Sequence, residues 1–153
     1  MQDSDLTPPS SGSIAAILPA AGSGERFGAD RNKLFAQLAG KPLWFHAASR
    51  LAARDEVGRI ILVISAADRD ACEDEFASQV RELDLQLVTG GAARTDSVRA
   101  GLDALADDTK TDLVAIHDAA RPLVSDVDLG AVLAAGSRSG AAILATPVSG
   151  TVK

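Results

Sequence analysis

One run of residues, from Arg59 to Ser65, restricts the possible folds more than any other part of this 153-residue chain. Its centre, Ile60 to Ile64, consists only of Ile, Leu and Val and has no polar face. A strand that is apolar on both faces is typical of a parallel sheet covered by helices on each side. Aromatic residues make up only 3% of the chain, so the core must be built mainly from aliphatic residues. The run therefore predicts an α/β domain.

Further segments with strand and helix patterns alternate along the chain. The expected strands are 14–18, 85–88, 112–117 and 141–146. The expected helices are 43–53, 68–80, one capped by Thr95 or Asp96 that buries Val98, Leu102 and Leu105, and 126–138, which Ser125 and Asp128 cap. This order predicts a Rossmann-like, mostly parallel sheet with helices on both faces. Ligands of such sheets bind at the carboxyl ends of the strands, near a switch in strand order.

The start of the chain differs from the rest in composition. Residues 1–13 are polar and contain Ser, Pro and Gly, so we expect a disordered tail before a single domain at 14–153. They lack the features of a signal peptide, and no apolar run has membrane-spanning length. The net charge of −6 disfavours nucleic-acid binding, and Cys72 as the single cysteine cannot form an internal disulfide. We therefore expect a cytoplasmic protein without a membrane or nucleic-acid partner.

A glycine-rich stretch follows the first expected strand. It reads Pro19-Ala20-Ala21-Gly22-Ser23-Gly24-Glu25-Arg26-Phe27, and Lys33 follows it. Glycine lets backbone N–H groups approach a ligand, so the stretch can cradle an anion, with Arg26 and Lys33 as fixed charges. It lacks the Gly-Lys-Ser/Thr ending of a P-loop and the third glycine of a dinucleotide fingerprint. The alternative is an ordinary strand-to-helix turn with solvated charges.

Two more polar turns follow later strands. Gly90-Gly91 precedes Arg94 to Ser97 at a helix start, an arrangement suited to a polar ligand, although a plain helix cap explains it as well. The other turn is His117-Asp118-Ala119-Ala120-Arg121-Pro122. A carboxylate at a strand end suits Mg²⁺, which binds few protein oxygens together with substrate phosphates. The alternative there is a local Asp118–Arg121 ion pair. We expect all three turns to converge on one edge of the sheet.

Together these motifs resemble those of a known family. Leu18 to Phe27, Lys33 and Leu38 to Leu43 are similar to the signature of nucleotidyltransferases with a Rossmann-like sheet, the nucleotide-diphospho-sugar transferase type. The later motifs, Gly90 to Val98 and His117 to Pro122, narrow the resemblance. They are similar to those of the 2-C-methyl-D-erythritol 4-phosphate cytidylyltransferases of the non-mevalonate isoprenoid pathway.

The resemblance implies a reaction and a role for each matching residue. CMP would pass from CTP to 2-C-methyl-D-erythritol 4-phosphate, with Mg²⁺ or another divalent cation as cofactor and release of pyrophosphate. The catalytic residues would be Arg26 and Lys33. The nucleotide would contact Ala20, Ala21, Gly22, Ser23, Gly24, Gly91, Ala92, Ser97, Asp118 and Ala119. Arg121 and Thr151 would lie near the polyol phosphate, and Asp118 would hold the metal.

The sequence departs from the family pattern in two places. Asn32 stands where the family usually has Pro, which predicts a less rigid loop around Lys33. The family's chain also continues past Lys153 with a dimerising arm and further basic residues. We therefore expect the C-terminal part of the family domain to be missing here, and the full-length family member to be a homodimer.

Other functions stay open at this point. One is a cytidylyltransferase for ribitol 5-phosphate, or a nucleotidyltransferase for another sugar phosphate or for the molybdenum cofactor. A second is a non-catalytic fragment that binds CTP. An oxidoreductase with a dinucleotide cofactor fits less well because of the glycine spacing, and only Asp68 is a candidate for its acidic ribose ligand.

Overall fold

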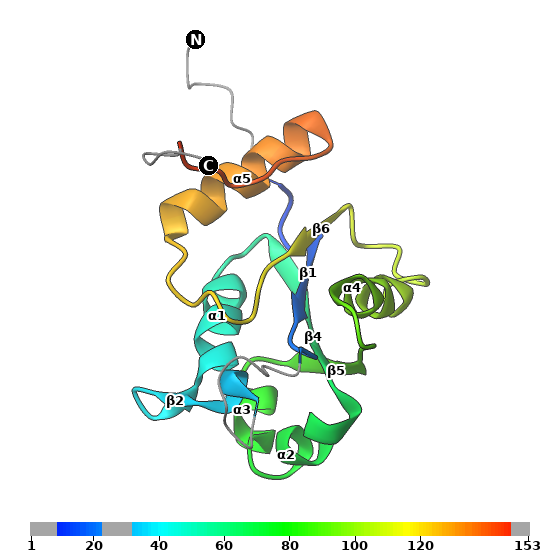
Figure 1. Cartoon of the computed structure of the whole chain (residues 1–153). Helices are drawn as coiled ribbons and strands as arrows, with labels where there is room; N and C mark the ends of the chain where they lie inside the picture. The colour runs from blue at the N-terminus through cyan, green and yellow to red at the C-terminus, as the bar shows by residue number, and fades with distance from the viewer. Residues whose placement is uncertain (1–8, 23–31, 148–153) are drawn as a thin grey trace, which may run out of the picture.

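A computed structural model describes residues 9–22 and 32–147, and within them one four-stranded parallel sheet forms the centre. Its strands are β1 (Ile14–Pro19), β4 (Val57–Ile64), β5 (Leu85–Thr89) and β6 (Leu113–Ile116). They lie in the order β5-β4-β1-β6 (Figure 1). After β5 the chain returns to the far side of β1, so the strand order switches between β1 and β6. Ligands of open α/β sheets bind at such a point.

Helices cover both faces of the sheet, which confirms the expected fold class. Alternate residues of β1 face opposite ways: Ala16 and Leu18 pack in the larger core cluster, and Ala15 and Ile17 pack in the smaller one. The larger cluster includes α1 (Leu43–Ala52), which matches the helix expected at 43–53. On the other face lies α4 (Arg94–Asp103) (Figure 1). The central strands are therefore buried on both faces, as the apolar run predicted.

The helix expected at 68–80 is wrong as one continuous element, although most of its residues are helical. The chain instead forms the 3-10 turn η3 (Ala66–Asp68), α2 (Arg69–Glu73) and α3 (Ala77–Glu82). The break brings Phe76 into the core, where its ring lies 5.4 Å from the ring of Phe35 and 6.2 Å from that of Trp44, between centroids. Burying the Phe76 ring stabilises the fold more than three further residues of continuous helix would.

The strand expected at 141–146 is also wrong, although the helix before it is confirmed. That helix is α5 (Asp126–Ser139), and the Ser125 hydroxyl accepts a hydrogen bond from the Asp128 N–H at its start. Residues 141–147 follow it without strand structure and are exposed. An apolar sequence becomes a strand only when a neighbouring strand satisfies its backbone groups. Within the described residues, β6 pairs with β1 alone.

The remaining described elements are short. They are η2 (Lys33–Phe35), β2 (Gln37–Leu38) and β3 (Lys41–Pro42), and the last two form a small antiparallel hairpin. Of the tail expected at 1–13, residues 1–8 lie outside the described part, and the Gly12 N–H donates to the Asp55 carbonyl at 2.9 Å. No helix among the described residues has the length and apolar character needed to cross a membrane.

Candidate functional site

The turn after β1 is held in place from two sides. The Ala20 N–H donates to the Val63 carbonyl of β4 at 2.7 Å, which continues the sheet by one residue. The Ala20 carbonyl accepts a hydrogen bond from Asn32 Nδ2 at 3.1 Å. Ala20 itself is buried, and Ala21 and Gly22 are more exposed. The turn therefore leaves the sheet at a fixed place beside the switch in strand order.

The turn after β5 packs directly against the turn after β1. The Gly90 N–H donates to the Ile64 carbonyl at 2.8 Å. A Cβ atom on Gly90 would lie 2.6 Å from Ser97 Oγ, 2.8 Å from Val63 Cγ1 and 3.0 Å from the Cβ of Ala21. Only glycine fits between these neighbours without a shift. This close packing brings Ala21 and Ser97 together, although they are far apart in the sequence.

The helix that follows begins earlier than the sequence indicated. Its N-cap is Ala93, and Thr95 and Asp96 lie inside the first turn. The Asp96 carboxylate instead reaches back and accepts a hydrogen bond from the Ala93 N–H at 3.0 Å. Gly91 is needed here, because a Cβ atom on it would lie 2.5 Å from the Cβ of Asp96. Of the three apolar residues expected to be buried by this segment, Leu105 is buried, Val98 is half-buried and Leu102 is exposed.

The third turn follows β6 and brings a carboxylate to the same edge of the sheet as the other two turns. We call this edge, formed by the three turns, the rim. The His117 N–H donates to the Ile17 carbonyl at 3.0 Å, which fixes the start of the turn beside β1. Asp118 Oδ2 accepts from Arg121 Nε at 2.9 Å, and Asp118 Oδ1 pairs with Arg94 Nη1 from the start of α4. The local ion pair considered from the sequence is therefore present. Arg94 adds a second partner from another turn, which the sequence only suggested as a possible ligand contact.

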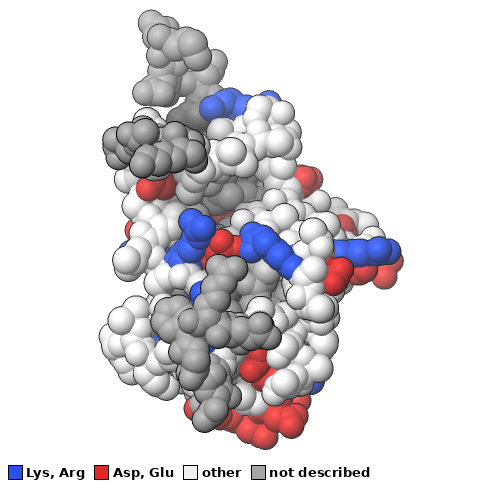
Figure 2. All heavy atoms as spheres, viewed as in Figure 1, with Lys and Arg blue, Asp and Glu red and all other residues white. Residues whose placement is uncertain are grey.

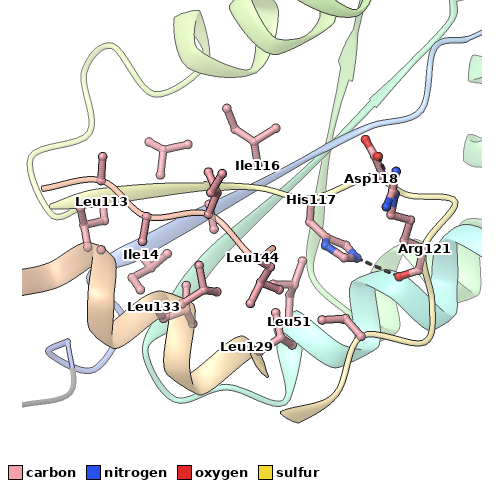
Figure 3. A pocket seen from close by; sticks show the side chains of 18 of the residues that line it. Ile14, Leu51, Leu113, Ile116, His117, Asp118, Arg121, Leu129, Leu133 and Leu144 are labelled. Atoms are coloured by element: carbon pink, nitrogen blue, oxygen red, sulfur yellow. Dashed lines mark hydrogen bonds and ion pairs between the residues drawn. The ribbon is translucent and has the colours of Figure 1, made fainter. Parts of the chain in front are cut away.

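His117 supports this turn by a hydrogen bond. Its Nε2 atom makes a 2.9 Å hydrogen bond with the Arg121 carbonyl, and Figure 3 shows the ring pointing toward that carbonyl. The bond closes the turn that holds Asp118. His117 therefore has a structural role in this turn.

The rim is locally basic in an acidic chain. Two guanidinium groups, of Arg94 and Arg121, share the single carboxylate of Asp118, and both side chains are largely exposed. On the face shown in Figure 2, basic side chains flank an acidic group. Guanidinium groups with free donor positions bind phosphate oxygens strongly. The arrangement therefore suits an anionic ligand better than a cationic one.

Hydrogen bonds of Asn32 hold the turn that carries Lys33. Asn32 caps η2, because its Oδ1 atom accepts a hydrogen bond from the Leu34 N–H at 3.1 Å. Its Nδ2 atom holds the Ala20 carbonyl, and Leu34 and Phe35 are buried behind it. The expectation of a less rigid loop around Lys33 stays a prediction, and residues 23–31 of that loop lie outside the described part. A side-chain amide fixes the turn where the family pattern uses the proline ring.

The comparisons with known proteins are consistent with this geometry. Residues 14–153 match a family model described as IspD, 2-C-methyl-D-erythritol 4-phosphate cytidylyltransferase. The chain belongs to this family. A relative named 2-C-methyl-D-erythritol 4-phosphate cytidylyltransferase, from Rhodopirellula baltica, is 48% identical over 150 residues, which cover 92% of this chain and 62% of the relative. The chain thus spans about three fifths of the length of this curated relative.

Two solved structures resemble the fold of this IspD family chain. One is 4-diphosphocytidyl-2C-methyl-D-erythritol synthase from Anaerococcus prevotii, with a TM-score of 0.64 and 29% identity over 82% of this chain and 51% of the other. A second structure, named 4-diphosphocytidyl-2C-methyl-D-erythritol synthase, has a TM-score of 0.74 at 21% identity and covers 92% of this chain and 62% of the other. At that identity the second likeness concerns the fold alone.

Most residues to which the IspD resemblance assigns a role lie at the rim. The first turn holds Ala20, Ala21 and Gly22, the second Gly91, Ala92 and Ser97, and the third Asp118, Ala119 and Arg121. Lys33 begins η2, and its neighbour Asn32 bonds to the Ala20 carbonyl. Ala119 is fully buried and packs in the larger core cluster, so its side chain fixes the third turn to the core. Ser23, Gly24, Arg26 and Thr151 lie outside the described residues.

The donor set at the rim also bears on the metal that the IspD resemblance implies. Among residues 9–22 and 32–147, no three His, Cys, Asp or Glu side chains gather in a way that could hold a metal ion. Asp118 is the carboxylate of the third turn, and the Asp96 carboxylate of the second turn is bonded to the Ala93 N–H. Mg²⁺ often binds one or two carboxylates and takes its other ligands from water and substrate phosphates. The site therefore fits a cation that arrives with a nucleotide and is held in part by Asp118.

Proposed function

We propose that this chain carries the nucleotide-binding part of a cytidylyltransferase that transfers CMP from CTP to 2-C-methyl-D-erythritol 4-phosphate. The observation that carries the proposal is the joining of three turns at one rim. Gly90 packs against Ala21 of the first turn and Ser97 of α4, and Arg94 of the same helix pairs with Asp118 of the third turn. Backbone groups and guanidinium groups thus face one place, which suits a triphosphate.

The chemistry requires positioning and charge neutralisation. An oxygen of the acceptor phosphate attacks the α-phosphorus of CTP and forms a new P–O bond, while the bond to the pyrophosphate oxygen breaks. The attacking phosphate is already anionic, so no general base is needed, and His117 is free to hold the third turn. Lys33 and Arg26 would stabilise the negative charge that builds up on the leaving pyrophosphate.

We further propose that Asp118 holds Mg²⁺ when the nucleotide is bound. The cation supplies positive charge to the triphosphate oxygens. Asp118 would then exchange part of its pairing with Arg94 and Arg121 for the metal, and the released guanidinium groups would bind phosphate. The expected observation is a CTP affinity that depends on Mg²⁺ in the unaltered protein and much less so in Asp118→Asn.

Release of pyrophosphate over a panel of substrates tests the proposed reaction. The nucleotides are CTP, UTP, ATP and GTP, and the acceptors are 2-C-methyl-D-erythritol 4-phosphate and ribitol 5-phosphate. We expect release only with CTP and the first acceptor. If only ribitol 5-phosphate supports release, the proposed acceptor is wrong and ribitol 5-phosphate takes its place. CTP binding without any product would indicate a non-catalytic fragment. Light scattering of a full-length family member tests the homodimer that the resemblance implies for it.

A further inference from the structure

Asn32, Asp68 and Ser65 form a hydrogen-bonded network behind the first turn. Asn32 Nδ2 donates both to the Ala20 carbonyl and to Asp68 Oδ2, each at 3.1 Å. The Ser65 hydroxyl donates to the same carboxylate oxygen at 2.7 Å and accepts from the Asp68 N–H at 3.2 Å. All of these bonds are partly buried, where a hydrogen bond is electrostatically stronger than in water.

The network joins three segments that are far apart in the sequence. Ala20 directly follows β1, Asn32 begins the turn of Lys33, and Ser65 to Asp68 leads from β4 into η3. The Asn32 amide is the common partner, because its N–H groups reach two of the segments and its oxygen caps the third. Asp68, considered from the sequence as a ribose ligand, is thus occupied in the sheet-to-turn connection.

We propose that Asn32 is a positioning residue for phosphate binding, with its amide oriented by Asp68 and Ser65. It holds the turn of Lys33 against the end of β1. The Lys33 charge and the backbone of the first turn can then bind the same phosphates. The inference rests on the proposed binding of CTP and assigns a role that the resemblance does not supply, since Asn32 departs from the family pattern. Small displacements of a charged group at such a site reduce its effect strongly.

The chain offers a matched control in a second Ser-Asp turn. At the start of α5 the Ser125 hydroxyl donates to Asp128 Oδ2 at 2.6 Å and accepts from the Asp128 N–H at 3.1 Å. This geometry repeats that of Ser65 and Asp68 almost atom for atom. Among the described residues, Asp128 of α5 bonds to Ser125 and to no turn of the rim, so its loss tests hydrogen-bond removal alone.

The experiment compares the affinities for CTP and for CMP, measured by calorimetry, in the unaltered protein and in the variants. We expect Asn32→Ala and Asp68→Ala to reduce the preference for CTP over CMP roughly tenfold or more, because the β- and γ-phosphates lose a correctly placed Lys33. Asp128→Ala should leave that preference unchanged. An equal loss of CTP and CMP affinity in Asn32→Ala would indicate general loosening of the fold and would overturn the positioning role.

A charge exchange tests the network itself. Asn32→Asp keeps the acceptor for the Leu34 N–H, but it removes the donors and places two carboxylates next to each other. We expect it to lose at least as much CTP preference as Asn32→Ala. The double variant Asn32→Asp/Asp68→Asn restores a donor between the two side chains and should regain part of the preference. A double variant no better than Asn32→Asp would contradict the proposal.

The outcomes also separate this inference from the proposed function. An unaltered protein that does not bind CTP at all would overturn the proposed function, and the positioning role with it. An unaltered protein that binds CTP, together with an Asn32→Ala variant that binds it equally well, would overturn the positioning role alone.

Discussion

The carboxyl end and the outer edge of β6 have opposite chemistry. At its end, Asp118 pairs with Arg94 and Arg121, so two turns are joined by charge. Along its edge, Ile116 is 48% exposed. A hollow of about 820 Å³ runs from this edge, where Leu113, Leu133 and Leu144 line it, to Asp118 and Arg121 of the rim (Figure 3). One four-residue strand thus supports a connected polar rim and an open apolar surface.

The comparison separates the groups that face the proposed ligand from the groups that stabilise the fold. The turns of the rim are fixed mainly by β1 and β4, whose central residues are buried on both faces. The region of β6 and α5 has fewer buried neighbours among the described residues. Changes at the rim should therefore affect ligand binding and turnover, whereas changes in the sheet should affect stability in proportion to burial. Four predictions test this separation.

The largest effect is expected from Lys33→Ala. Loss of one charge that stabilises the leaving phosphates should lower turnover by roughly 10²-fold or more. The free energy of unfolding should stay nearly unchanged, because Lys33 is exposed. Pyrophosphate release and urea denaturation measure the two quantities. Lys41→Ala is the control, since it removes an exposed ion pair with Glu82 on a different part of the chain. Normal turnover in a folded Lys33→Ala protein would exclude the catalytic role.

A stability difference is expected between two isoleucines of neighbouring regions. Ile61→Ala removes a fully buried side chain of β4 and should cost about 2–5 kcal/mol of unfolding free energy. Ile116→Ala removes a half-exposed side chain of β6 and should cost about 1 kcal/mol or less. Urea denaturation of both variants provides the measurement. Similar costs would mean that the edge of β6 is packed in solution, and the contrast between the two regions would disappear.

Two glycine substitutions should change the free energy of unfolding in opposite directions. Gly90→Ala places a methyl group 2.6 Å from Ser97 Oγ and should destabilise the protein by about 1–3 kcal/mol. Gly136→Ala lies in α5, where a Cβ atom meets nothing within 4 Å, and should stabilise it by about 0.5–1 kcal/mol. Thermal unfolding of both variants measures whether each is less or more stable than the unaltered protein. Weaker CTP binding is expected only for Gly90→Ala, and an effect of Gly136→Ala on CTP would show that the regions are coupled.

The smallest effect concerns pH and the amino end of β6. The Lys110 N–H, with help from the Arg59 guanidinium and the Thr111 hydroxyl, holds the pKa of Asp108 below its ordinary value. A carboxylate with a lowered pKa in the folded state contributes stability above its unfolded pKa, and this is lost as the pH falls through the folded pKa. Asp108→Asn should therefore lower the Tm at neutral pH, and the difference should vanish in acid. Asp107→Asn, at an exposed neighbouring position, is the control.

The convergence of the three turns was predicted better than some of the elements around them. Apolar strands that end in glycine or aspartate place their turns at one edge of any parallel sheet, so Ala21, Gly90 and Asp118 could be grouped from the sequence. Arg94 was harder to assign, because its partner Asp118 is 24 residues away and belongs to another turn. The partners of Asn32 were hidden for the same reason, since its bonds to Ala20 and Asp68 depend on tertiary contacts.

The amino-acid sequence by itself determined the α/β class, the buried central strands and the three polar turns. These follow from local patterns of apolar residues and glycine, which act over a few residues. The tertiary structure alone decided the break before Phe76, the absence of a strand at 141–146 and the anchoring of Lys33 by Asn32. Each of these depends on a partner far away in the sequence: an aromatic cluster, a neighbouring strand edge or a backbone carbonyl. Such partners are brought close only when the whole chain folds.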